Sequence, residues 1–275
     1  MVVRLHHIEI LCKNLQQRLS QFCGRFGFNV LAETSASPKK RFAIKRDSIH
    51  FVLTEGSGRK DTVFDVALEV KNVGLASQRA VKQGGKILKR LSTDCDSYGD
   101  IESVVVQSPI GNVTHTLLNS SNYAGIFLPG YTEQNTSLAP EYQTTLDPKL
   151  THFDHLTFAV PENCSPFLLD WYEKCFGFTR FKINSEEEDD GFLVRSSIQG
   201  ASIGMRLTAM EYWKCAESGV SLPTDEPGGS VKFVFAEPLP GQGEISEFQI
   251  SQTTGLPSEK QGLGVLHNCR ALDSQ

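Results

Sequence analysis

Hydrophobic and polar residues alternate in two stretches of the chain, and each stretch leads into a segment of helical spacing. Over residues 153–160 the alternation places His155 on one face of a predicted strand and Asp154 on the opposite face. Gly177 lies where the helix that follows would end. The apolar face of this predicted helix carries Phe167, Leu168, Trp171 and Cys175.

The same pattern occurs near the N-terminus, so the chain contains an internal repeat. Residues 5–28 and 153–178 each carry a His at their third position, His7 and His155, and each ends in Phe-Gly-Phe. The N-terminal helix is also amphipathic, with an apolar face of Leu15, Leu19, Phe22 and Phe26. Shared features in the same order indicate that both stretches begin a module of one kind.

Residues 1–120 predict two consecutive modules of the order β-α-β-β-β. A single module has one amphipathic sheet face that it cannot bury alone, so we predict an α+β domain of two paired modules over 3–130. After the first strand and helix, the expected elements are strands at 41–45, 49–53 and 63–70, a helix at 74–83, and strands at 86–89, 102–107 and 113–118.

The composition changes after this domain. Residues 131–150 are rich in Thr, Ser, Pro, Asn and Gln and have no apolar period, so we expect a linker. A second domain of the same architecture is expected over 151–250, with a late strand at 230–236 and without its last module. Residues 251–275 match no part of a module, and we expect a divergent tail there.

Composition and charge exclude several classes of function. The 275 residues are 39% hydrophobic and 21% charged, and the net charge is −5. This balance is typical of a globular protein and argues against a nucleic-acid partner. No run of about 18 apolar residues predicts a membrane span. The seven cysteines include no Cys-x-x-Cys pair, and we expect free thiols.

Three segments carry a resemblance to a known family. THTLLNSSNYAGIFLPGY at 114–131, LTHFDHLTFAV at 150–160 and FVFAEPLPG at 233–241 resemble stretches of the 4-hydroxyphenylpyruvate dioxygenase family, especially its vertebrate dioxygenase-like branch. That family belongs to the vicinal-oxygen-chelate superfamily, whose domains pair β-α-β-β-β modules. The resemblance implies an Fe(II)-dependent dioxygenase, with one iron per subunit held by two His and one carboxylate, that acts on a small-molecule 2-oxo acid with O₂.

The resemblance assigns the first iron ligand to His155, beside the small residues Thr157 and Ala159. The alternative is a half-buried strand His with local hydrogen bonds. His7 holds the equivalent place in the first domain, where we expect a structural role because 63–70 contains no partner His. The remaining histidines that we do not expect to bind metal are His6, His50, His115 and His152.

The second ligand implied by the resemblance is His267, because Gly-Leu-Gly-Val-Leu-His at 262–267 is similar to the family's ligand-bearing strand opening. The long separation from Glu247 leaves a chance match as the alternative. The third ligand should be a Glu on the last strand of a final module. The eight residues after His267 contain no Glu.

Two departures from the family concern the substrate. Ala236 and Leu266 stand where the family's catabolic enzymes carry amides that hydrogen-bond the substrate ring. With the ring untethered, the resemblance implies conversion of 4-hydroxyphenylpyruvate to 4-hydroxymandelate with loss of CO₂. Homogentisate formation, as in tyrosine catabolism, is one alternative. A metal-free binding module of the same fold is another.

The resemblance also implies a mitochondrial location and a homodimer. Residues 1–10 show no targeting leader, which favours the cytoplasm instead.

A last expectation concerns stability. An unpaired module would expose one sheet face, which carries Phe158, Phe233 and Phe235 or their face neighbours, and burial of such side chains is worth about 1.5–3 kcal/mol each. We therefore expect the chain to be stable over 1–130, to be loose or aggregation-prone from 151 onward, and to lack dioxygenase activity.

Overall fold

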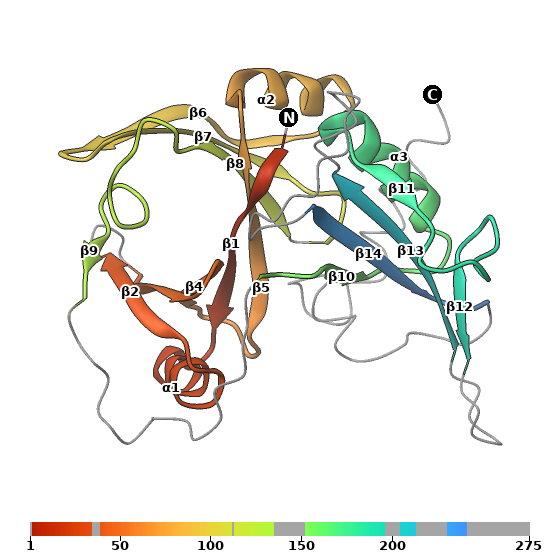
Figure 1. Cartoon of the computed structure of the whole chain (residues 1–275), viewed down its shortest axis with the longest axis horizontal. Helices are drawn as coiled ribbons and strands as arrows, with labels where there is room; N and C mark the ends of the chain where they lie inside the picture. Colours follow the sequence, from red (N-terminus) through yellow and green to blue (C-terminus); the bar gives the residue numbers. More distant parts are fainter. Residues whose placement is uncertain are drawn as a thin grey trace.

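Two β-sheets and three helices form the part of the chain that the structure describes (Figure 1). The structure is a computed structural model. The described residues are 2–34, 39–111, 113–134, 152–195, 204–212 and 230–240. None of the helices in these ranges is long and apolar enough to cross a membrane.

The first sheet consists of the two modules predicted from the sequence. The elements of the first module are β1 (Val2–Cys12), α1 (Leu15–Phe26), β2 (Asn29–Thr34), β3 (Arg41–Arg46) and β4 (Ile49–Glu55). Those of the second are β5 (Thr62–Val70), α2 (Val73–Lys82), β6 (Ile87–Asp96), β7 (Gly99–Gln107) and β8 (Thr114–Asn119). In both modules the first strand pairs in parallel with the last, and the antiparallel pair β1–β5 joins the modules.

The resulting strand order is β6-β7-β8-β5-β1-β4-β3-β2-β9. The short strand β9 (Thr132–Glu133) pairs with β2 and lies inside the predicted linker. The segment just before it, which contains the Phe-Leu-Pro-Gly stretch, packs on the face of the sheet opposite to α1. There Phe127 is buried among Ala32, Ala43 and Val52.

A third module forms the second sheet. Its elements are β10 (Leu156–Ala159), α3 (Ser165–Phe176), β11 (Thr179–Phe181), β12 (Phe192–Arg195), β13 (Gly204–Tyr212) and β14 (Val231–Pro238). As in the first sheet, the first and last strands are parallel, and β13 pairs with β14, β11 and β12. The described residues contain no fourth module.

The helix ends follow local sequence signals. Asn14 and Asn72 cap α1 and α2, because each side chain accepts a hydrogen bond from a backbone N–H of the first turn. Helices α1 and α3 end at Gly27 and Gly177, whose φ angles of 67° and 76° lie in the left-handed region. The helix end predicted at Gly177 is therefore confirmed, and α1 ends at the matching glycine, Gly27.

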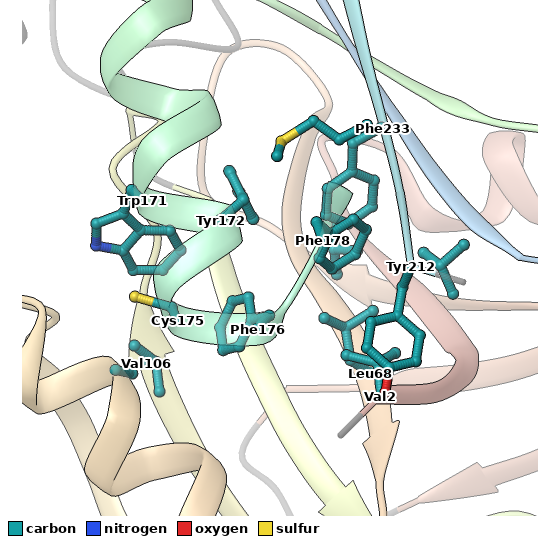
Figure 2. Packing of buried hydrophobic residues seen from close by; sticks show 14 of the residues in the cluster. Val2, Leu68, Val106, Trp171, Tyr172, Cys175, Phe176, Phe178, Tyr212 and Phe233 are labelled. Atoms are coloured by element: carbon teal, nitrogen blue, oxygen red, sulfur yellow. The ribbon is translucent and has the colours of Figure 1, made fainter. Parts of the chain in front are cut away.

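One hydrophobic core joins the two sheets (Figure 2). Trp171 and Cys175 of α3 point toward Val106 of the first sheet, and the rings of Phe178 and Phe233 stack with their centroids 4.8 Å apart, near Leu68. Helices α2 and α3 lie side by side over this core (Figure 1). The two sheets are thus held together by shared burial.

This core corrects one expectation from the sequence. Phe158, Phe233 and Phe235 were expected on an exposed face, but their exposed fractions are 5%, 0% and 0%. They lie beneath α3 and belong to the core shared with the first sheet. A fourth module is not needed to bury them, because α3 covers this face of the sheet.

A hydrogen-bonded chain crosses the same boundary. The Nδ1 of His115 lies 3.0 Å from the carbonyl oxygen of Val66 and so must donate to it. The Nε2 is then the acceptor for the hydroxyl of Tyr172, 2.8 Å away. That hydroxyl lies 3.2 Å from Oγ of Ser108, which accepts from the backbone N–H of Ile110. All of these buried polar groups are satisfied.

Candidate functional site

His155 lies immediately before β10 and not within it. The strand begins at Leu156, so the predicted alternation over 153–160 is wrong at its start. The ring of Phe153 instead packs against Phe51 of the first sheet, with centroids 5.4 Å apart. Because 153–155 lies outside the strand, Asp154 and His155 are not held on opposite faces.

Asp154 and His155 form a hydrogen-bonded pair. The Nδ1 of His155 lies 2.6 Å from Oδ2 of Asp154, and this hydrogen bond, aided by Lys232, lowers the pKa of Asp154 below its ordinary value. Asp154 is thus a carboxylate at neutral pH, and it accepts the proton that Nδ1 of His155 donates. The Nε2 of His155 lies on the ring edge away from Asp154, on a side chain that is 47% exposed.

This pair lines a cleft between the two sheets. The cleft encloses about 510 Å³, open mouth included. Its walls come from the start of β1, the segment that leads into β10, and the start of β14. The lining residues are Arg4, Leu5, Ser48, His152, Phe153, Asp154, His155, Leu156, Ser230, Val231 and Lys232.

Two cationic residues of this cleft were missed by the sequence analysis. Lys232 Nζ lies 3.7 Å from Asp154, and the Nε of Arg4 donates to Glu69 at 2.6 Å. The signal for Lys232 was present, since this lysine stands in the otherwise apolar strand pattern before Phe233. Arg4 carried no such signal, because its position depends on how the two sheets meet.

Two alanines lie side by side on one face of the second sheet. Ala159 of β10 is level with Ala236 of β14, and Ala236 is level with Leu207 of β13. This face is opposite to the one that Phe233 and Phe235 bury under α3. Ala236, predicted to leave a substrate ring untethered, therefore lies beside the last residue of β10, the strand that follows His155.

His7 lies in a buried cluster on the inner face of the first sheet. Its Nδ1 is 2.8 Å from Nδ1 of His6, and both rings contact Phe127. His50 stacks on the same phenylalanine. Burial lowers the pKa of His7 to about 3 and that of His50 to about 4, so both rings are neutral at pH 7. His6 was expected to have no specific role, and the structure makes it part of this packing.

Two buried carboxyl groups accompany these histidines. Glu9 and Asp65 lie opposite each other on β1 and β5. Glu9 accepts a hydrogen bond from Thr54, and Asp65 accepts one from Thr114. Burial raises the pKa of Asp65 to about 7. Sequence alternation alone did not reveal this polar interior.

No group of three or more His, Cys, Asp or Glu side chains within the described ranges is arranged to hold a metal ion. His155 is the one predicted ligand that lies in these ranges. His267, together with Leu266 and the predicted tail, lies outside the described residues.

Comparison with known proteins finds several relatives along most of the chain, although no family model matches. A protein of Rattus norvegicus, the 4-hydroxyphenylpyruvate dioxygenase-like protein, is 28% identical over 240 residues, which cover 81% of this chain and 59% of the relative. The protein of that name in Homo sapiens is 27% identical over 269 residues, covering 90% and 65%.

The chain is a homologue of the 4-hydroxyphenylpyruvate dioxygenase-like proteins. The 4-hydroxyphenylpyruvate dioxygenase of Xenopus tropicalis is also similar, with 32% identity over 198 residues, which cover 64% of this chain and 48% of that enzyme. The chain spans about half to two thirds of the length of these curated relatives.

A solved structure confirms the vicinal-oxygen-chelate fold. A mutant of 4-hydroxymandelate synthase from Streptomyces coelicolor superimposes with a TM-score of 0.63 at 14% identity, covering 86% of this chain and 64% of that one. A fusion protein of a xylose isomerase-like TIM barrel and 4-hydroxyphenylpyruvate dioxygenase gives a TM-score of 0.56. At this level of identity the match concerns the fold.

The family implies an iron, and His155 fits the part of one ligand. A metal-binding His usually donates its second ring nitrogen to a carboxylate, as Nδ1 of His155 does to Asp154. The other described residues do not complete the set of three ligands. The described part of the chain therefore contains one residue suited to hold a metal, His155, with a carboxylate hydrogen-bonded to it.

Proposed function

We propose that this protein is an Fe(II)-dependent dioxygenase that converts 4-hydroxyphenylpyruvate and O₂ to 4-hydroxymandelate and CO₂. The homology over 81–90% of the chain supports a dioxygenase-like protein of this family. The observation that carries the proposal at the level of residues is the His155–Asp154 pair, with Nε2 of His155 directed away from its carboxylate partner. The proposed iron ligands are His155 and His267.

The residues around His155 have defined roles in this proposal. Asp154 accepts a hydrogen bond from Nδ1 and so orients the ring, with Nε2 as the nitrogen that would bind the metal. Ala236 provides no side-chain donor to a substrate ring, which favours hydroxylation at the benzylic carbon over attack on the ring. A bound Fe(II) would carry out the chemistry that involves O₂.

Product analysis tests this proposal. The purified protein is incubated with Fe(II), ascorbate, O₂ and 4-hydroxyphenylpyruvate, and the products are separated and identified by mass and retention. 4-Hydroxymandelate is expected. Homogentisate would instead support the catabolic reaction of the alternative hypothesis, and no turnover of any aryl pyruvate would contradict both.

A metal-free binding module is the second candidate. It is favoured by the incomplete ligand set of the described residues. Iron analysis after desalting separates the two candidates. An Fe(II) content near one per subunit supports the dioxygenase, and a content near zero together with tight binding of an aryl pyruvate supports the binding module.

Location and assembly are further parts of the proposal. We propose a mitochondrial homodimer, with the cytoplasm as the alternative location. Fractionation of the untagged protein and light scattering of the purified protein test these two statements.

A further inference from the structure

The cleft between the sheets is lined by more cations than anions. Its charged lining residues are two cations, Arg4 and Lys232, and one anion, Asp154, whereas the whole chain carries a net charge of −5. Asp154 already accepts a hydrogen bond from His155. The local field of the cleft therefore favours a negatively charged ligand.

Both cations have donors to spare. Arg4 uses Nε for Glu69, and its two Nη groups make no hydrogen bond within the described residues. Glu69 is itself further engaged, because it accepts a hydrogen bond from Ser120. Lys232 has the ion pair with Asp154 at 3.7 Å and no hydrogen bond in the described ranges. The ammonium can thus bind an anion without breaking a short contact.

Part of the cleft wall is apolar. Leu5, Phe153, Leu156 and Val231 contribute side chains to its wall. Phe153 is held in place by the ring of Phe51. An apolar wall with a few converging polar groups is the usual composition of a site for a small organic molecule.

We propose that this cleft binds a small organic anion, a carboxylate on an apolar body, and that Lys232 and Arg4 recognise the carboxylate. The apolar body lies against Phe153 and Leu156, which places the ligand beside Nε2 of His155. The proposed substrate, an aryl 2-oxo acid, is an anion of this class, and in this respect the inference rests on the proposed function.

Calorimetric titration of the whole chain in EDTA, without iron, tests the proposal with two probes of equal shape. The probes are 3-phenylpropionate and its neutral amide. The carboxylate is expected to bind at least about tenfold more tightly than the amide, because charge-assisted hydrogen bonds are the stronger ones. Raising the salt from about 20 mM to about 200 mM should weaken the carboxylate alone.

Variants locate the site. Lys232→Met is expected to bring the affinity for the carboxylate close to that for the amide, and Lys232→Arg should restore most of it. Lys174→Met is the matched control, since Lys174 pairs with Asp170 on α3 and does not line the cleft. It should bind both probes as the unaltered protein does.

Equal affinities for the two probes, or an unchanged affinity in Lys232→Met, would overturn the inference. This failure is distinguishable from failure of the proposed function. Turnover of 4-hydroxyphenylpyruvate without selective binding of the carboxylate probe refutes only the proposal that the cleft binds an anion. Selective binding without turnover supports anion binding in the cleft and refutes the proposed reaction.

Discussion

Single residues at the boundary between the sheets contribute measurably to the free energy of unfolding. The hydroxyl of Tyr172 is the donor to Nε2 of His115, and both side chains have an exposed fraction of 0%. Tyr172→Phe leaves Nε2 and Ser108 without this partner, and we expect the free energy of unfolding to fall by about 1–3 kcal/mol. Urea unfolding followed by circular dichroism measures it.

The matched control for this prediction is Tyr98→Phe. Tyr98 is 61% exposed, so the same chemical change should alter the free energy of unfolding by less than about 0.5 kcal/mol. Equal effects at the two positions would contradict the hydrogen-bonded chain from Ser108 to His115.

Buried histidines make stability depend on pH. Burial lowers the pKa of His115 and His50 to about 4 and that of His7 to about 3, and His6 is shifted in the same direction. Below the ordinary pKa of 6.5 the unfolded chain binds these protons and the folded chain does not. Their contribution to stability is therefore complete above pH 6.5 and is lost as the pH falls toward 4. Asp65, with a pKa raised to about 7, acts in the opposite direction.

The pKa shifts of the four histidines lower the stability as the pH falls, and only the shift of Asp65 raises it. We therefore expect the urea concentration at the unfolding midpoint to decrease when the pH is lowered from 7 to 5. Each histidine contributes up to about 1.4 kcal/mol per pH unit in the range where the two states differ in protonation. His115→Gln should make the fall less steep. A midpoint that is constant or rises over this range would contradict the buried, neutral histidines.

At the scale of the elements, helix ends follow local sequence and can be tested at Gly177. This residue ends α3 with φ 76°, and an added Cβ would meet nothing closer than 3.7 Å. The cost of Gly177→Ala is thus conformational, and we expect about 1–2 kcal/mol. Gly58→Ala, at a glycine without positive φ, is the control and should be near neutral. Thermal unfolding of both variants measures the difference.

Sequence patterns predicted most elements because these elements depend on nearby residues. The strand expected at 63–70 is observed at Thr62–Val70, and the helix expected at 74–83 is observed at Val73–Lys82. The predictions failed where contact with a residue distant in the sequence determines where a strand begins or ends. β6 extends to Asp96 because it pairs with β7, although its side chains are mostly exposed. β10 begins late because Phe153 packs on the first sheet.

At the scale of the whole molecule, the shared core links the stability of the two sheets. The expectations of a stable 1–130, a loose second domain and a chain without dioxygenase activity rested on exposed aromatic side chains. These side chains are buried, and the proposed function therefore expects activity instead. Phe233→Ala is expected to cost about 3–5 kcal/mol. Hydrogen exchange should then increase in β5 and α2 as well as in β13 and β14, because all of them border one core.

Phe42→Ala is the control for this coupling. Phe42 is buried in a separate cluster under α1, so its removal should increase exchange there and leave α3 protected. Increased exchange confined to the second sheet in Phe233→Ala would contradict the shared core. No local pattern in the sequence contains this information, since α2 and α3 meet only in the folded chain. The cleft between the sheets was hidden from the sequence for the same reason.

We propose that His155 is a metal ligand of an aryl-pyruvate dioxygenase. The most direct test is the rate of 4-hydroxymandelate formation by the protein and by His155→Gln, with Fe(II) and O₂ in excess. Loss of a residue that merely supports a ligand costs about 10–100-fold, so loss of the ligand should lower the rate at least about a hundredfold. We expect this decrease in rate with an unchanged melting temperature. A His155→Gln protein that forms product at the original rate would contradict it.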